Sequence, residues 1–184
     1  MRRTDRALLV LLAPPAIVLP AAAARAVQYL DVSQAQRTLF ADATRFEPSP
    51  VTLSDNQRHA IEKSSPTRTP IPTDRVWRAL AGDRLLGHVI VDEVYGKHEF
   101  ITYAVAIDPS GAVLGVEIMD YRETHGGEVR QADWRAQFRG KRAADALELG
   151  HGIANISGAT MSCKHITDGV KRLLALYAVA LEGH

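Results

Sequence analysis

A short turn near the end of the chain has the residues to bind a phosphate. It reads NISGAT (residues 155–160) and runs into a segment whose apolar residues recur every three or four positions, the pattern of an amphipathic helix. Gly158 would let the backbone turn tightly, and the free N–H groups of the first helical turn favour negative charge. Thr160 would place a hydroxyl beside such a phosphate, and Lys164, one turn later, would add a positive charge.

The same turn also has a purely structural interpretation. Ser and Thr are favoured at the N-caps of helices, so Ser157 and Thr160 could serve only to cap the helix that follows. At this level both interpretations, a phosphate site and a helix cap, stay open.

A second loop, after the last predicted strand, combines groups that suit a ligand site. Ligand contacts often lie on loops that a rigid scaffold positions, and adjacent glycines let the backbone approach a flat ligand closely. The alternative is a polar strand-to-helix loop that needs glycine only for its geometry. The loop contains an acid, a hydroxyl, an imidazole and two glycines: Glu123, Thr124, His125, Gly126 and Gly127.

The elements before these loops predict an antiparallel sheet. Runs rich in β-branched residues occupy positions 84–96, 99–108 and 112–121, and residues 76–83 lead into the first of them. The sequence Asp-Pro-Ser-Gly at 108–111 suits a type I turn between the last two runs. Strands joined by such short connections form a meander.

Helical patterns flank this meander on both sides. Asp31 or Ser33 would begin the first helix and Ser54 the second. Helices around an antiparallel meander predict an α+β fold. The expected helices span residues 31–44, 54–63, 129–138 and 143–149 and a segment from 160 onward, with loops at 46–51 and 64–73.

The first 26 residues have the features of an export signal. Three arginines within the first six residues precede an apolar run at 7–24, and small residues that fit a signal-peptidase site follow. The run is long enough to span a bilayer, but its prolines would interrupt a continuous helix. We therefore expect residues 1–26 to be a cleaved signal peptide or, alternatively, a membrane anchor, and residues 27–184 to form one domain outside the cytoplasm.

Charge and cysteine content exclude several classes of protein. Residues 1–26 carry four Arg and one Asp, so without them the net charge falls from +1 to −2, which argues against a nucleic-acid-binding surface. Cys163 is the only cysteine, which excludes an internal disulfide and a cysteine-built zinc or iron–sulfur site, and we expect it to be a small half-buried filler. His151 and His165 have no partners at metal-ligand spacing, so no metal site is expected.

Taken together and in this order, the two loops resemble the FMN-binding domain of exported flavoproteins. Relatives in this family include the flavin-carrying subunits of the sodium-pumping NADH:quinone oxidoreductase and of the Rnf complex, and the membrane regulator of nitrous-oxide respiration. The resemblance runs from about Val76 to Leu176 and includes Trp134 and Phe138 downstream of the glycine loop.

The resemblance implies how a flavin would be held. In this family a Ser/Thr-Gly-Ala-Thr motif presents its final Thr for a phosphoester link to FMN, which a dedicated flavin transferase attaches. Thr160 would then be the attachment residue, Ser157, Gly158 and Ala159 would shape the phosphate turn, and the glycine loop would cover the isoalloxazine. One departure is Ala154, which stands three positions before the Ser, where the family often has an acidic residue that the transferase could recognise.

The resemblance implies an exported electron-transfer flavoprotein with FMN, which exchanges electrons with membrane or periplasmic redox partners and has no substrate turnover of its own. It would be periplasmic, or anchored in the membrane and facing the periplasm. The alternative from a different class is a cofactor-free exported binding module in which the Ser-Gly-Ala-Thr turn only caps a helix. A flavoenzyme acting on a small substrate lacks a general acid/base constellation in the sequence.

Fused to a reporter, residues 1–30 should carry it out of the cytoplasm, because an Arg-flanked apolar start is the feature that the export machinery binds. N-terminal sequencing should then show cleavage after Ala23 or Ala26, whereas an intact Met1 on an exported fusion would favour the anchor. A fusion retained in the cytoplasm would contradict export.

Overall fold

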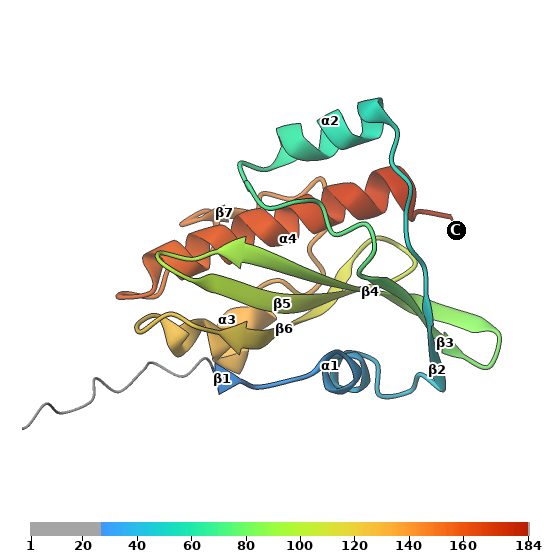
Figure 1. Ribbon diagram of the computed structural model, residues 1–184, viewed down its shortest axis with the longest axis horizontal. Helices are drawn as coiled ribbons and strands as arrows, with labels where there is room; N and C mark the ends of the chain where they lie inside the picture. The colour runs from blue at the N-terminus through green and yellow to red at the C-terminus, as the bar shows by residue number, and fades with distance from the viewer. Residues whose placement is uncertain (1–26, 184) are drawn as a thin grey trace, which may run out of the picture.

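The computed structural model describes residues 27–183, and the predicted signal or anchor at residues 1–26 lies outside this part of the chain. A six-stranded antiparallel sheet organises the described residues (Figure 1), with the strand order β1-β6-β5-β4-β3-β2. Strands β3 to β6 pair in chain order, which confirms the predicted meander. The strands are β1 (Val27–Gln28), β2 (Arg45–Pro48), β3 (Val76–Ala81), β4 (Arg84–Tyr95), β5 (Phe100–Ile107) and β6 (Val113–Tyr121).

Helices cover both faces of this sheet. Figure 1 shows α4 across one face with α2 outside it, and α1 against the opposite face. The architecture is therefore α+β, as the sequence predicts. The helices are α1 (Val32–Leu39), α2 (Asp55–Ser64), the 3₁₀ helix η1 (Gly127–Arg130), α3 (Ala132–Ala136) and α4 (Thr160–Ala180), and the short strands β7 (Glu148–Leu149) and β8 (Gly152–Ile153) pair with each other.

Two capping boxes begin the N-terminal helices. In α1 the Asp31 carboxylate accepts the backbone N–H of Gln34 at 2.7 Å, and the Gln34 side chain accepts the backbone N–H of Asp31 at 2.8 Å. Ser54 and Gln57 make the same pair of bonds at the start of α2. Each box satisfies two N–H groups that a helix start leaves unpaired. Asp31 and Ser54 are thus confirmed as the residues that begin these helices.

The apolar face of α4 forms the centre of the core. Gly169 lets the helix approach the sheet closely, because a Cβ there would overlap Tyr103 Oη and lie 2.9 Å from Val94 Cγ1. Helix α4 contacts both β4 and β5. The side chains that the sequence periodicity places on the inner face are all buried: Ile166, Val170, Leu173, Leu174 and Tyr177.

A buried ion pair fixes α4 along the sheet. Arg172 Nη2 lies 2.6 Å from Asp92 Oδ2 on β4, and Tyr103 Oη donates to the same carboxylate at 2.6 Å. Arg172 also donates to the backbone carbonyl of Thr69, in the connector between α2 and β3. Removing one partner would leave the other as an unpaired buried charge, so the pair holds helix, sheet and connector in one arrangement.

The N-terminal boundaries differ from the sequence prediction in two places. The helix expected over 31–44 ends at Leu39, because the chain then turns into β2. The prediction of a loop over 46–51 is wrong for residues 46–48. These residues belong to β2, which pairs with β3 at the edge of the sheet. Pro48 lies at the end of this edge strand, where its missing N–H is tolerated.

The helix predicted over 143–149 is wrong. A turn replaces it, in which the Asp145 carboxylate accepts the backbone N–H of Arg142 at 2.8 Å. Gly150 and Gly152 follow with φ of +83° and +99°, left-handed conformations that place the chain in the β7–β8 pair. The local preference of Ala and Leu for helix is overridden by this turn chemistry.

The helix predicted over 129–138 is divided. Gln131 is extended, with φ −60° and ψ 131°, and separates η1 from α3. Trp134 and Phe138 still lie one turn apart, both buried, with their rings edge to face at 5.2 Å between centroids. The aromatic pair, rather than a continuous helix, therefore anchors this segment to the core.

His88 on β4 makes stability depend on pH. Its side chain is 1% exposed, neither ring nitrogen has a hydrogen-bond partner among residues 27–183, and its ring meets Tyr177 edge-on at 5.8 Å. Burial, together with the positive charge of Arg78, lowers the pKa of His88 from 6.5 to about 4. Below pH 6.5 the unfolded chain therefore takes up a proton that the folded chain resists, and stability falls until about pH 4.

As the pH falls from 6.5 to about 4, the free energy of unfolding of the wild type should decrease by about 2 to 3 kcal/mol more than that of His88→Leu. Denaturant unfolding at a series of pH values measures both. The leucine variant removes the titrating ring and keeps an apolar side chain of similar size. His59→Leu, at an exposed position on α2, is the control and should retain the wild-type slope. Parallel slopes for wild type and His88→Leu would refute this role.

Candidate functional site

The two loops singled out in the sequence face one cavity of about 660 Å³. This volume lies within the ~300–1,000 Å³ usual for ligand sites. Three segments line it: the tip of the β4–β5 hairpin (97–98), the loop after β6 (123–128) and the start of α4 with its preceding turn (158–162). The structure thus brings together these predicted residues: Glu123, Thr124, His125, Gly126, Gly127, Gly158, Ala159 and Thr160.

Thr160 is the first residue of α4 and is exposed on the cavity wall. The N-cap is Ala159, and no side chain makes a capping hydrogen bond there, so the interpretation of Ser157 or Thr160 as the cap is wrong. Gly158 has φ +86°, which turns the chain sharply into the helix. Asn155 Nδ2 donates to Thr160 Oγ1 at 3.0 Å and orients the hydroxyl.

The glycine loop lies directly against the first turn of α4. Gly126 has φ +90°, and a Cβ there would be 2.6 Å from Tyr121 Oη and 3.1 Å from Ser162 Oγ. Tyr121 Oη donates to the backbone carbonyl of His125 at 2.5 Å and lies 3.0 Å from Ser162 Oγ. Burial raises the pKa of the Tyr121 hydroxyl, which remains a neutral donor. Tyr121 and Ser162 therefore hold the loop against the helix.

Sequence reasoning misses both members of this link. The strand pattern marks Tyr121 only as the last residue of its run, and Ser162 follows Thr160 by two positions within the helix. Their contact joins residues 41 positions apart, and no local pattern reports such a contact.

Glu123 holds the β4–β5 hairpin. Its Oε1 accepts the backbone N–H groups of His98 at 2.5 Å and Glu99 at 3.1 Å. Burial raises the pKa of the Glu123 carboxyl, but the N–H groups of residues 97–99 outweigh burial, and the pKa falls below its usual range. Glu123 is therefore a charged acceptor that fixes the hairpin tip at the edge of the cavity.

Two predicted residues lie outside the cavity lining. Lys164 pairs with Asp168 at 2.5 Å and lines a separate hollow of about 330 Å³ together with Arg68 and His165. Ser157 is exposed and does not line the cavity. Basic side chains reach the cavity from a different element, because Lys97 and His98 line it from the hairpin tip.

Cys163 is fully buried instead of half-buried, and burial raises the pKa of its thiol. It packs in the core beneath the first turn of α4. The low pKa that a helix start favours is therefore absent, and Cys163 is a core side chain.

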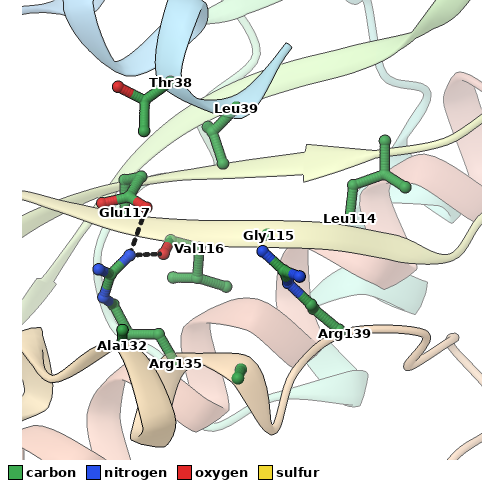
Figure 2. Close-up of a pocket in the computed structure, with 10 residues that line it drawn as sticks. Thr38, Leu39, Leu114, Gly115, Val116, Glu117, Ala132, Arg135 and Arg139 are labelled. Carbon is green, nitrogen blue, oxygen red and sulfur yellow. Dashed lines mark hydrogen bonds and ion pairs between the residues drawn. The ribbon is translucent and has the colours of Figure 1, made fainter. Parts of the chain in front are cut away.

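A smaller hollow of about 130 Å³ lies between α1, β6 and α3. Figure 2 shows Arg135 reaching from α3 to the Glu117 side chain and to the backbone carbonyl of Val116. Through these bonds Arg135 holds α3 on β6 of the sheet. The hollow is well below the size of ordinary ligand sites.

Within residues 27–183, no cluster of three or more His, Cys, Asp or Glu side chains could hold a metal ion. In the same part of the chain, no helix is both long and apolar enough to cross a membrane.

Residues 96–175 match the family model of the FMN-binding domain. The match begins at the β4–β5 hairpin, ends within α4 and contains every residue that lines the large cavity. The cavity therefore lies within the part of the chain that is similar to the FMN-binding domain. The cofactor that this match supports is FMN, as the resemblance in the sequence implies.

Two individual proteins are similar to the chain. One component of the proton-translocating ferredoxin:NAD(+) oxidoreductase complex of Clostridium ljungdahlii is 31% identical over 103 residues, covering 52% of this chain and 55% of that protein. The chain thus matches about half the length of this relative. The crystal structure of Shewanella oneidensis NqrC is 20% identical, with 77% of this chain and 81% of that chain covered and a TM-score of 0.48.

The cavity suits FMN chemically. The helix start beside Thr160 offers N–H groups for a phosphate, and Lys97 brings a positive charge to the cavity. Gly126 and Gly127 expose backbone without side chains to the cavity, which suits a flat ring. When bound, FMN supplies the redox chemistry, and these residues bind and orient it.

Gly126→Ala should weaken FMN binding about tenfold, because strain at positive φ and the contact with Tyr121 together cost about 1–3 kcal/mol. Gly127→Ala is the matched comparison and should have a smaller effect, since a Cβ there meets nothing within 4 Å. Fluorescence titration with FMN, on protein made without a flavin transferase, measures both affinities, and thermal unfolding checks the fold. Equal losses in the two variants would contradict the contact between Gly126 and α4.

Proposed function

We propose that this protein is an exported electron-transfer flavoprotein that carries FMN through a phosphoester on Thr160. The observation that carries the proposal is the Thr160 hydroxyl, which is exposed on the cavity wall at the start of a 21-residue helix and has no capping role. A phosphate bonded there would lie where the helix dipole and unpaired N–H groups stabilise its charge.

The geometry around Thr160 supports the bond to phosphate. Asn155 donates to Thr160 Oγ1, so the hydroxyl keeps its own proton available for a base of the transferase. The net change is a condensation: the oxygen of Thr160 joins the phosphorus, the bond from phosphorus to one phosphate hydroxyl breaks, and that hydroxyl leaves with the threonine proton as water. The adduct therefore adds the mass of FMN minus water.

Electron transfer is the activity that the relatives favour. The Clostridium ljungdahlii protein belongs to a ferredoxin:NAD(+) oxidoreductase complex and shares about half its length with this chain. We propose redox partners in or beside a membrane, a flavin transferase that attaches FMN, and a position in the periplasm or on its membrane surface. The arginine-flanked apolar start of the sequence supports this location.

Ala154 is compatible with recognition by a transferase. Its backbone is held on both sides, since its N–H donates to Gln137 Oε1 and its carbonyl accepts from Trp134 Nε1, each at 2.8 Å. Its side chain is exposed, so a carboxylate at this position would face solvent and be open to another protein.

Co-expressed with a flavin transferase, the wild type should gain the mass of FMN minus water, whereas Thr160→Ala and Thr160→Val should fold and lack it. Intact mass gives the adduct, and the visible spectrum gives the flavin. Ser157→Ala should be milder, because Ser157 lies outside the cavity. Wild type without the adduct, or an alanine variant that still carries it, would remove Thr160 from this role.

Ala154→Asp is a gain-of-function test of the same reaction. If a carboxylate three residues before Ser157 aids recognition, the aspartate variant should show a larger flavinylated fraction than wild type at a limiting amount of transferase. An unchanged fraction would show that this position does not limit attachment.

A further inference from the structure

We propose that Lys97 and His98, at the tip of the β4–β5 hairpin, set the redox potential of the bound FMN, and that Glu123 is the positioning residue that holds them there. This inference rests on FMN occupying the cavity described above, and it does not require the phosphoester on Thr160.

The hairpin tip is braced from three directions. Glu123 Oε1 accepts the N–H groups of His98 and Glu99, and the N–H of Gly96 donates to the carbonyl of Glu99 at 2.7 Å. Tyr95 Oη donates to the carbonyl of His98 at 2.7 Å. A turn whose backbone groups are satisfied in this way holds its side chains in fixed positions.

A ring contact supports the brace at its base. Tyr95 and Phe100 lie opposite each other in the β4–β5 pairing, with their rings edge to face at 5.2 Å between centroids. Both rings are about half exposed, at 50% and 42%. Aromatic pairs of this geometry stabilise strand ends, so the tip is held to the sheet as well as to Glu123.

The side chains of Lys97 and His98 line the cavity, and among residues 27–183 neither makes a hydrogen bond or an ion pair. His98 does interact electrostatically with the Glu123 carboxylate, and this interaction helps to lower the pKa of Glu123. Other basic side chains nearby are engaged, as Lys164 is with Asp168. The rigid backbone of the tip therefore holds these basic side chains at the cavity before the cofactor is reduced, so that no reorganisation is needed for their charge to act on it.

Such groups act on the redox equilibrium through charge. FMN takes up two electrons from a reductant and one proton from solvent on reduction near neutral pH, and so gains one negative charge. A positive group beside the cavity stabilises this reduced state more than the oxidised state. Lys97 therefore raises the midpoint potential, and His98 adds to the effect when protonated.

The Glu128 carboxylate has the reverse influence, because it lines the cavity from the loop after β6 and is negative. His125 lines the cavity from the same loop, but it is a basic side chain and does not oppose Lys97. Glu123 also carries a negative charge, but its carboxylate is occupied by the hairpin N–H groups. By holding Lys97 and His98 in place, Glu123 raises the midpoint potential, whereas its own negative charge lowers the potential. Removing Glu123 therefore shows which of the two effects is larger.

The test is a spectroelectrochemical titration of the FMN-loaded protein, with dithionite as the reductant. Lys97→Met should lower the midpoint potential by about 30 mV, which is a tenfold shift against the reduced form for a two-electron couple. Lys97→Arg keeps the charge and should retain the wild-type value, and the fall in potential caused by His98→Gln should be greatest at the acidic end of a pH series. Lys63→Met, an exposed lysine on α2, is the matched control and should leave it unchanged.

Glu123→Ala separates positioning from charge. If Glu123 acts by holding the tip, its loss should lower the potential, whereas a carboxylate that acts only through its own charge would raise the potential when removed. Affinity for oxidised FMN, measured by fluorescence, reports separately how far each variant changes binding of the cofactor.

The outcomes distinguish this inference from the proposed function. Potentials for Lys97→Met and His98→Gln that match Lys63→Met would overturn the role of the hairpin tip, even where Thr160 carries its adduct. Absence of the adduct would overturn the phosphoester, while the potentials of non-covalently bound FMN would still test the tip. A rise in potential for Glu123→Ala would overturn its positioning role.

Discussion

The packing of α4 across the sheet is the constraint on which the cofactor site depends. Gly169 lets the helix lie against Tyr103, and the buried Arg172–Asp92 pair fixes how far along the sheet it lies. A helix is stiff, so fixing it at Gly169 and Arg172 also fixes its first residue, which at 1.5 Å per residue lies about 14 Å from Gly169 and about 18 Å from Arg172. Thr160 is therefore positioned from the core, while Asn155 and the segment at Ala154 anchor the turn before it.

Polar side chains around the cavity divide into two sets. Tyr121 and Glu123 use their hydrogen bonds on backbone groups and so fix the glycine loop and the hairpin tip. Lys97 and His98 line the cavity, and within residues 27–183 their side chains make no such bonds. Lys97 and His98 depend on Tyr121 and Glu123, because basic side chains on a mobile loop would not stay beside the cofactor.

Much of this arrangement could be predicted from local patterns. The β-branched runs predict β4 to β6, the spacing of apolar residues predicts the buried face of α4, and Asp31 (with Ser33 as the alternative) and Ser54 are predicted as the starts of α1 and α2. Contacts between side chains could not be predicted in the same way: helical spacing places Lys164 at the phosphate, but Asp168, one turn later, pairs with it. The segment 143–149 has helical composition, yet two glycines with positive φ direct it into a turn and a short strand pair.

The backbone bonds at Ala154 have an evolutionary consequence. Trp134 and Gln137 hold this residue through its carbonyl and N–H, which every amino acid except proline provides in full. The side chain at 154 is thus free to drift without disturbing the approach to Thr160. A lineage could gain or lose a carboxylate there in a single substitution while its fold and cavity stay the same, and under the proposed attachment at Thr160 this would change how a flavin transferase recognises the protein.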